Sequence, residues 1–135
     1  GDSSGFDSGA SDYSWGCIER NTGGTTITNT RDEYDDAIDM AEPPQHSGIG
    51  NDTSGLNEGF TGELTLHNPG DTTINNAVTF QNVSTNGTGV HFDYGGGIYL
   101  NNFSGPLSNL DRVQFFFSTG NITSGRMTVW GFKHT

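Results

Sequence analysis

The chain has 135 residues, about the length of one ordinary domain, with 30% apolar residues, 21 glycines and a net charge of −11. No stretch is apolar for the ~18 residues that a membrane helix needs, so we expect no membrane insertion. The negative charge would repel a phosphate backbone, which argues against a nucleic-acid partner. Cys17 is the only cysteine, so an intrachain disulfide is excluded and we expect a half-buried hydrophobe.

The N-terminal stretch, residues 1–12, is rich in Gly, Ser and Asp and is interpreted as a turn-rich approach to the first strand. The chain begins with Gly1 and not with Met, so we expect it to be a part cut from a longer chain. Tyr13, Trp15 and Cys17 then alternate with small residues, which predicts a strand that continues through Ile18.

The segment 30–41 admits two interpretations. Thr30 and Glu33 have capping-box spacing, and Tyr34, Ile38 and Ala41 would share one face of a short helix. The segment is short and precedes two prolines, and its apolar residues would also suit an exposed strand followed by a loop. Helix and strand both remain open here. Residues 45–59, which follow, are polar and Gly-rich and are predicted to form a long surface loop.

The middle of the chain has a clear strand rhythm. Alternating apolar residues predict strands at 63–67, 78–81 and 90–94, with a turn at 68–71 after the first. Three glycines then lead into a fourth apolar run at 98–100. Val90, Phe92 and Tyr94 share one face of their strand. Strands spaced by turns in this way are typical of an antiparallel sandwich or jelly roll.

The C-terminal part predicts a hairpin, with strands at 113–118 and 126–132. Val113, Phe115 and Phe117 would lie on one side of its first strand. Phe116, Trp130 and Phe132 point the opposite way, so the hairpin is apolar on both faces. Such a hairpin suits a central strand pair or one covered by a neighbouring subunit. These patterns together predict an all-β fold: one antiparallel, jelly-roll-like β-sandwich domain over 1–135 with long Gly/Asn-rich loops.

The stretch from Phe115 to Phe132 resembles the C-terminal hairpin of a group of bacteriophage virion proteins. In that group a strand ending in Ser-Gly-Asn leads through a Ser-Gly turn to a last strand, which closes with an aliphatic residue, an aromatic residue and a glycine. Val129, Trp130 and Gly131 occupy that closing place, with Trp where Tyr is commoner.

Two other segments fit the same group: Asp7 to Trp15, and the strand from Gly62 to Asn68. The resemblance implies a jelly-roll-like sandwich exposed on the tail or capsid surface of a virion. It implies contacts with other virion proteins and with copies of itself, and no chemistry. Members usually carry further β structure ahead of the point where this chain begins, so this chain would be the C-terminal part of a longer one.

Acidic side chains are the candidate metal ligands. Calcium prefers oxygen ligands, and two groups could supply them: Asp2, Asp7 and Asp12, or Asp32, Glu33, Asp35, Asp36 and Asp39. Neither group has the spacing of a calcium-binding loop, so we favour solvated acidic loops and expect no cofactor. The four histidines are scattered singly and one cysteine is too few for a zinc site.

The sequence has no recognisable catalytic motif for hydrolysis. It lacks the G-x-S-x-G motif of a nucleophilic serine and a convincing pair of carboxylates for a glycosidase. We therefore expect a non-enzymatic structural component of a phage particle, and a contact with a host-surface glycan is compatible with that role. The alternative is a carbohydrate-binding module of a secreted bacterial protein, because exposed aromatic rings stack on sugars. Candidate residues for sugar stacking or for an interface are Trp15, Tyr94, Tyr99, Phe116, Trp130 and Phe132.

Overall fold

The computed structural model describes most of the strand-forming part of the chain and much of its C-terminal part. The described residues are 9, 11–21, 27–40, 59–86, 89–100, 109–117, 122 and 124–131. Most of the N-terminal stretch and residues 45–58 of the predicted loop lie outside them.

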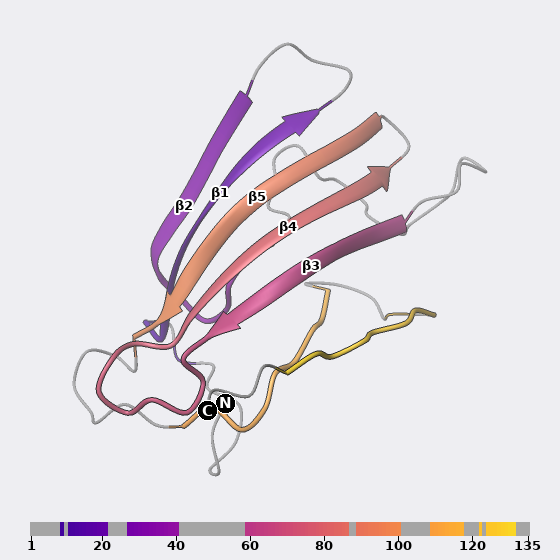
Figure 1. The fold of residues 1–135 in the computed structure, drawn as a ribbon. Coiled ribbons are helices and arrows are strands. Elements are labelled where there is room, and N and C mark those ends of the chain that lie inside the picture. Colours follow the sequence, from indigo (N-terminus) through magenta and orange to yellow (C-terminus); the bar gives the residue numbers. More distant parts are fainter. Residues whose placement is uncertain are drawn as a thin grey trace.

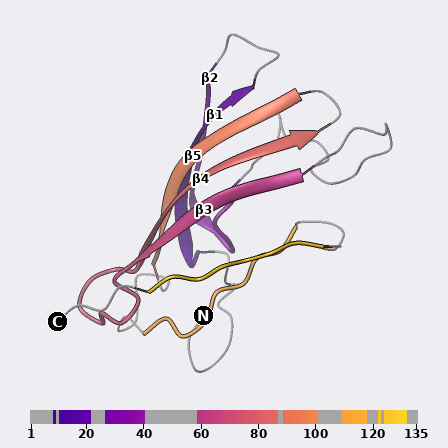
Figure 2. The same ribbon diagram turned by 45° about the vertical axis from the view of Figure 1, so that its right-hand side comes forward.

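Five antiparallel strands form one twisted, curved sheet with the order β2-β1-β5-β4-β3 (Figures 1 and 2). The strands are β1 (Tyr13–Asn21), β2 (Ile27–Asp35), β3 (Gly59–His67), β4 (Ala77–Asn86) and β5 (Gly89–Tyr99). The all-β prediction is confirmed, and no described residue is helical. It follows that the described part of the chain offers no helix able to cross a membrane.

The two faces of the sheet differ because successive side chains in a strand point to opposite sides. On one side, which we call the inner face, Trp15, Cys17 and Phe80 are almost fully buried and form the core. The segment after β2 packs against this core through Ile38 and Met40. The indole Nε1–H of Trp15 donates a hydrogen bond to Asp35 Oδ2 at 2.9 Å, so the ring is held at both its apolar and its polar end.

β5 is longer than the sequence indicates. The glycines 95–97 do not separate two strands, as the pattern had suggested; they continue β5 between β1 and β4. A Cβ atom at Gly95 would lie 2.6 Å from Phe80 Cζ and 2.5 Å from the Gly16 carbonyl oxygen. At Gly97 it would lie 2.9 Å from Ile38 Cδ1. Glycine is therefore required because the neighbouring core side chains fill the space that a side chain would take.

The segment that admitted both helix and strand forms a strand. β2 runs from Ile27 to Asp35, and the chain then bends through residues 36–40. β2 pairs with β1 along its length, with a register irregularity between Tyr13 and Trp15. Backbone pairing with β1 satisfies more groups than one isolated helical turn would, which explains why the strand prevails.

The turn after β3 matches the prediction. The Asp71 N–H donates to the Asn68 carbonyl oxygen at 3.0 Å, and Asn68 has a φ of 54°. Asparagine tolerates this left-handed conformation better than most residues. β3 begins at Gly59, so the last residue of the predicted loop belongs to this strand.

The predicted C-terminal hairpin is not formed as strands in the described residues 113–117 and 126–131. Both segments lie apart from the sheet, below β3 in both views (Figures 1 and 2). The Leu110 N–H donates to the Pro69 carbonyl oxygen at 2.8 Å, which holds the start of the first segment near the end of β3. The strand prediction was wrong here because alternating apolar residues make a strand only where a neighbouring backbone accepts its hydrogen bonds.

We expect Gly95→Ala to lower the free energy of unfolding by about 1–3 kcal/mol, because the added methyl group meets Phe80 and a backbone carbonyl. Gly16→Ala is the matched control, since its Cβ would have no neighbour closer than 3.8 Å and it also lies inside a strand. Urea denaturation of both variants measures the difference. Equal stabilities would contradict the proposed tight approach.

Candidate functional site

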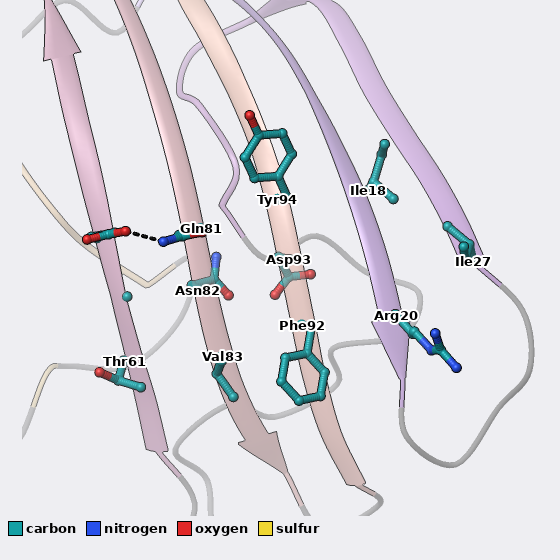
Figure 3. A pocket seen from close by; sticks show the side chains of 12 residues that line it. Ile18, Arg20, Ile27, Thr61, Gln81, Asn82, Val83, Phe92, Asp93 and Tyr94 are labelled. Atoms are coloured by element: carbon teal, nitrogen blue, oxygen red, sulfur yellow. Dashed lines mark hydrogen bonds between the residues drawn. The ribbon is translucent and has the colours of Figure 1, made fainter.

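The side of the sheet opposite the core carries a shallow open hollow with a volume of about 670 Å³. We call this side the open face (Figure 3). The hollow spans all five strands, and its lining residues are Ile18, Arg20, Ile27, Thr61, Gly62, Glu63, Gln81, Asn82, Val83, Phe92, Asp93 and Tyr94. Asn82 and Asp93 are only 4% and 3% exposed, because their side chains alternate to the inner face. Several of them present apolar or aromatic side chains to solvent.

Large apolar side chains on the open face are unusually accessible. The exposed fractions are 62% for Tyr94, 46% for Phe92, 61% for Ile27 and 49% for Ile18. A half-buried Val83 lies between the aromatic residues of β5 and the edge strand β3. Apolar side chains this accessible on one face of a sheet mark a contact site more often than a solvated face.

Strand register arranges these side chains in two rows across the sheet. Tyr94 lies opposite Ile18 of β1 and Gln81 of β4, while Phe92 lies opposite Arg20 and Val83. Directly opposed side chains in antiparallel strands have Cβ atoms ~5 Å apart, so each row forms a contiguous strip.

Polar side chains belong to the same rows as the apolar ones. The Gln81 Nε2 group donates a hydrogen bond to Glu63 Oε1 of β3, and Figure 3 shows this pair at one side of the hollow. Arg20 lies toward the opposite side, between Phe92 and Ile27 in the view. An apolar centre with polar groups around it can bind a protein surface or stack against a sugar ring.

The inner face also contains a buried polar cluster beyond the apolar core. Glu19, Ser84, His91 and Asp93 lie on the central strands β1, β4 and β5 and are almost fully buried. His91 Nδ1 and Glu19 Oε1 are 2.8 Å apart, and because a carboxylate can only accept, Nδ1 carries the proton. The Cys17 thiol lies 4.0 Å from Asp93 Oδ1.

The neighbouring Asn82 extends the cluster toward the segment after β2. Its Nδ2 group donates to the Met40 carbonyl oxygen at 2.8 Å. This bond joins β4 to the segment that packs against the core. The cluster therefore ties the sheet to its covering segment and is closed to solvent.

The acidic segment at the end of β2 is exposed or half-buried. Burial raises the pKa of Asp39, and repulsion from Asp35, Asp36 and Asp32 raises it further. Because the pKa of Asp39 is raised in the folded state, the stability that this group contributes is fully present at pH values below its pKa in the unfolded chain. It is lost as the pH rises through the folded value. Among the described residues, no group of three or more His, Cys, Asp and Glu side chains is placed to hold a metal ion.

The predicted aromatic residues separate into two sets. Trp15 and Tyr99 are only 4% and 5% exposed, so their ring faces are closed to a sugar or a partner. Tyr94, Phe116 and Trp130 are exposed, with Trp130 at 82%. Phe132 lies outside the described residues.

The weak calcium candidates lie mostly outside the described residues. Asp12 accepts a hydrogen bond from the Gly9 N–H at 2.7 Å, which closes a local turn. Asp2 and Asp7 lie outside the described residues. The first acidic group is therefore described only at Asp12.

Sequence reasoning missed Ile18, Ile27 and Arg20 as parts of a contact surface, and His91 with Glu19 as a buried pair. The alternation of β5 contained a signal, because His91 and Asp93 occupy the face opposite Phe92 and Tyr94. The side of β5 that carries His91 and Asp93 is the buried side.

The chain matches no family model. Searches of curated proteins and of solved structures also found no similar protein.

We expect His91→Ala to destabilise the fold by about 3–5 kcal/mol, because it leaves the buried Glu19 carboxylate without its histidine. His67→Ala is the control: His67 is exposed and bonds only to the exposed Thr79 hydroxyl, so a change within about 0.5 kcal/mol is expected. Chemical denaturation at neutral pH compares the two. A cost for His91→Ala no larger than that for His67→Ala would argue against a structural role for the pair.

Proposed function

We propose that the protein is a non-enzymatic, contact-making β module of a bacteriophage particle, located on the tail or capsid surface. The observation that carries the proposal is the uncovered apolar open face, where Ile18, Ile27, Phe92 and Tyr94 are all about half exposed or more. Isolated exposed apolar residues are ordinary on protein surfaces. Four of them on one face of three adjacent strands favour a partner that covers them.

The C-terminal segments supply a second apolar surface. Met127, Val129 and Trp130 have exposed fractions of 68%, 80% and 82%, and Phe116 is 61% exposed. A domain normally buries its sheets and extended segments in two or more packed layers. Two separate apolar surfaces on one small chain support an assembly in which neighbouring copies or other virion proteins supply the missing layer of the sandwich.

The virion location is supported by the resemblance of Phe115 to Phe132 to the C-terminal hairpin of phage virion proteins. A structural rather than catalytic role is supported by the burial of Glu19, His91 and Asp93, which leaves these titratable groups without solvent access. The open face itself carries Arg20 and the bonded pair Glu63 and Gln81. These three do not form an acid–base pair poised for catalysis.

A carbohydrate-binding role is the second candidate. It is favoured by the exposed rings of Phe92 and Tyr94 beside Arg20 and Gln81, since aromatic faces stack on sugars and polar groups bond to their hydroxyls. A glycan contact on the outside of a particle would combine both roles.

The direct test is mass spectrometry of particles purified from the culture that produces the protein. We expect the chain in the particles, and we expect Tyr94→Ser to reduce its incorporation by about tenfold, since burying an aromatic side chain contributes ~1.5–3 kcal/mol. Ile74→Ser is the matched control, because Ile74 is 48% exposed on a loop away from the hollow.

Absence from particles, together with no binding to any virion protein, would refute the proposal. A glycan array probed with wild type and with Tyr94→Ala tests the carbohydrate-binding role. Binding that is lost in a folded Tyr94→Ala variant would favour the carbohydrate role, and no binding by wild type would count against it.

A further inference from the structure

The two edges of the sheet differ in how they are protected from pairing. β2 carries Arg31, Asp32, Glu33 and Asp35 within nine residues. Charged side chains on an edge strand discourage the addition of another strand. The β2 edge is therefore protected against the addition of another strand.

The opposite edge, β3, has only one acidic residue, Glu63, and no basic residue other than His67. Register places Phe60, Leu64 and Leu66 on the inner face, opposite Ser84, Phe80 and Val78 of β4. Phe60 is 43% exposed, and the two leucines are half-buried. β3 is thus an edge strand whose backbone can pair with a further strand, and its apolar row can pack beside the side chains of that strand.

The C-terminal arm, which we define as residues 109–117 and 124–131, matches this edge. Val113, Phe115 and Phe117 recur with the strand period of two, like the apolar row of β3, and are 52%, 42% and 36% exposed. Apolar pairs across adjacent strands stabilise a sheet. The arm is therefore suited to continue the inner face beyond β3.

Charge favours a contact between the arm and the body of another copy. The arm contains two basic residues, Arg112 and Arg126, and one acidic residue, Asp111, whereas residues 1–108 contain two basic and fifteen acidic ones. Residues 1–108 of two copies would repel each other, but the net charge of the arm is opposite in sign to that of residues 1–108. A self-contact through the arm is the one that the charge distribution favours.

Within one copy, the arm does not reach its own edge strand as a paired strand. Leu110 is bonded to Pro69 just beyond the end of β3, yet the described arm residues form no ladder with β3. The arm instead lies apart from the sheet (Figure 2). No described residue pairs with the outer edge of β3, which is where an incoming strand would add.

We infer that the C-terminal arm of one copy adds as a strand to the β3 edge of a second copy, and that the exchange is reciprocal. A reciprocal exchange closes a two-fold dimer and leaves no unmatched arm. This inference rests on the proposed function, since it assigns the self-contact of the module to named segments. It leaves the open face available for another partner.

Sedimentation velocity of the full chain over a wide range of concentrations tests the inference. We expect a dimer whose dissociation constant rises at least about tenfold in Phe60→Lys, which charges the edge, and in Phe115→Ser, which weakens the arm. Ile74→Ser is the control, because Phe60, Phe115 and Ile74 are 43%, 42% and 48% exposed. Circular dichroism establishes that each variant is folded.

A synthetic peptide of residues 109–131 provides a second measurement that needs no variant of the protein. Added to wild type, it should compete for β3 and convert dimer to monomer, whereas the same peptide with serine at Phe115 and Phe117 should not. A dimer unaffected by both variants and by the peptide would overturn the arm exchange while leaving the contact module standing. A monomer at every concentration would also overturn it, and particle composition would then decide the proposed function separately.

Discussion

The fold depends on β5, the central strand that pairs with both β1 and β4 and so joins the β1–β2 hairpin to the β3–β4 hairpin. The close approach at Gly95 makes this junction possible. Phe80 of β4 fills the space beside Gly95, and Cys17 of β1 is the cross-strand partner of Gly95. A side chain at Gly95 would push these strands apart at the centre of the core.

The alternation of β5 then determines what each face can do. His91 and Asp93 point to the inner face, where His91 is bonded to Glu19 and the neighbouring Asn82 donates to the Met40 carbonyl oxygen. The same alternation leaves Tyr94 and its neighbours on the open face. Burial of the polar side of β5 therefore has the direct consequence that its aromatic side is exposed.

Much of the fold could be predicted because it depends on local patterns. Alternation predicted the strands that contain Trp15, Leu64, Phe80 and Tyr94, and the Asn68 turn followed from turn chemistry. The continuous course of β5 through its glycines could not be predicted, because the reason lies in side chains of other strands.

The functional surfaces were harder to predict. Trp15 became buried because its indole meets Asp35, twenty residues along the chain, and because Gly97 lies opposite it. Period-two alternation showed that Phe92 and Tyr94 share a face but not which face is covered. The arm that contains Phe115 has the right pattern for a strand, yet a strand also needs a partner backbone that no local pattern reveals.

The central claim is that this sheet is completed by contact with another chain. Amide hydrogen exchange followed by mass spectrometry at low and high protein concentration tests it most directly. The account predicts that exchange slows with concentration in β3 and in the segment 113–117, while the charged β2 edge is unchanged. Exchange rates independent of concentration in all of these segments, with no added virion protein or glycan slowing the open-face strands, would contradict it.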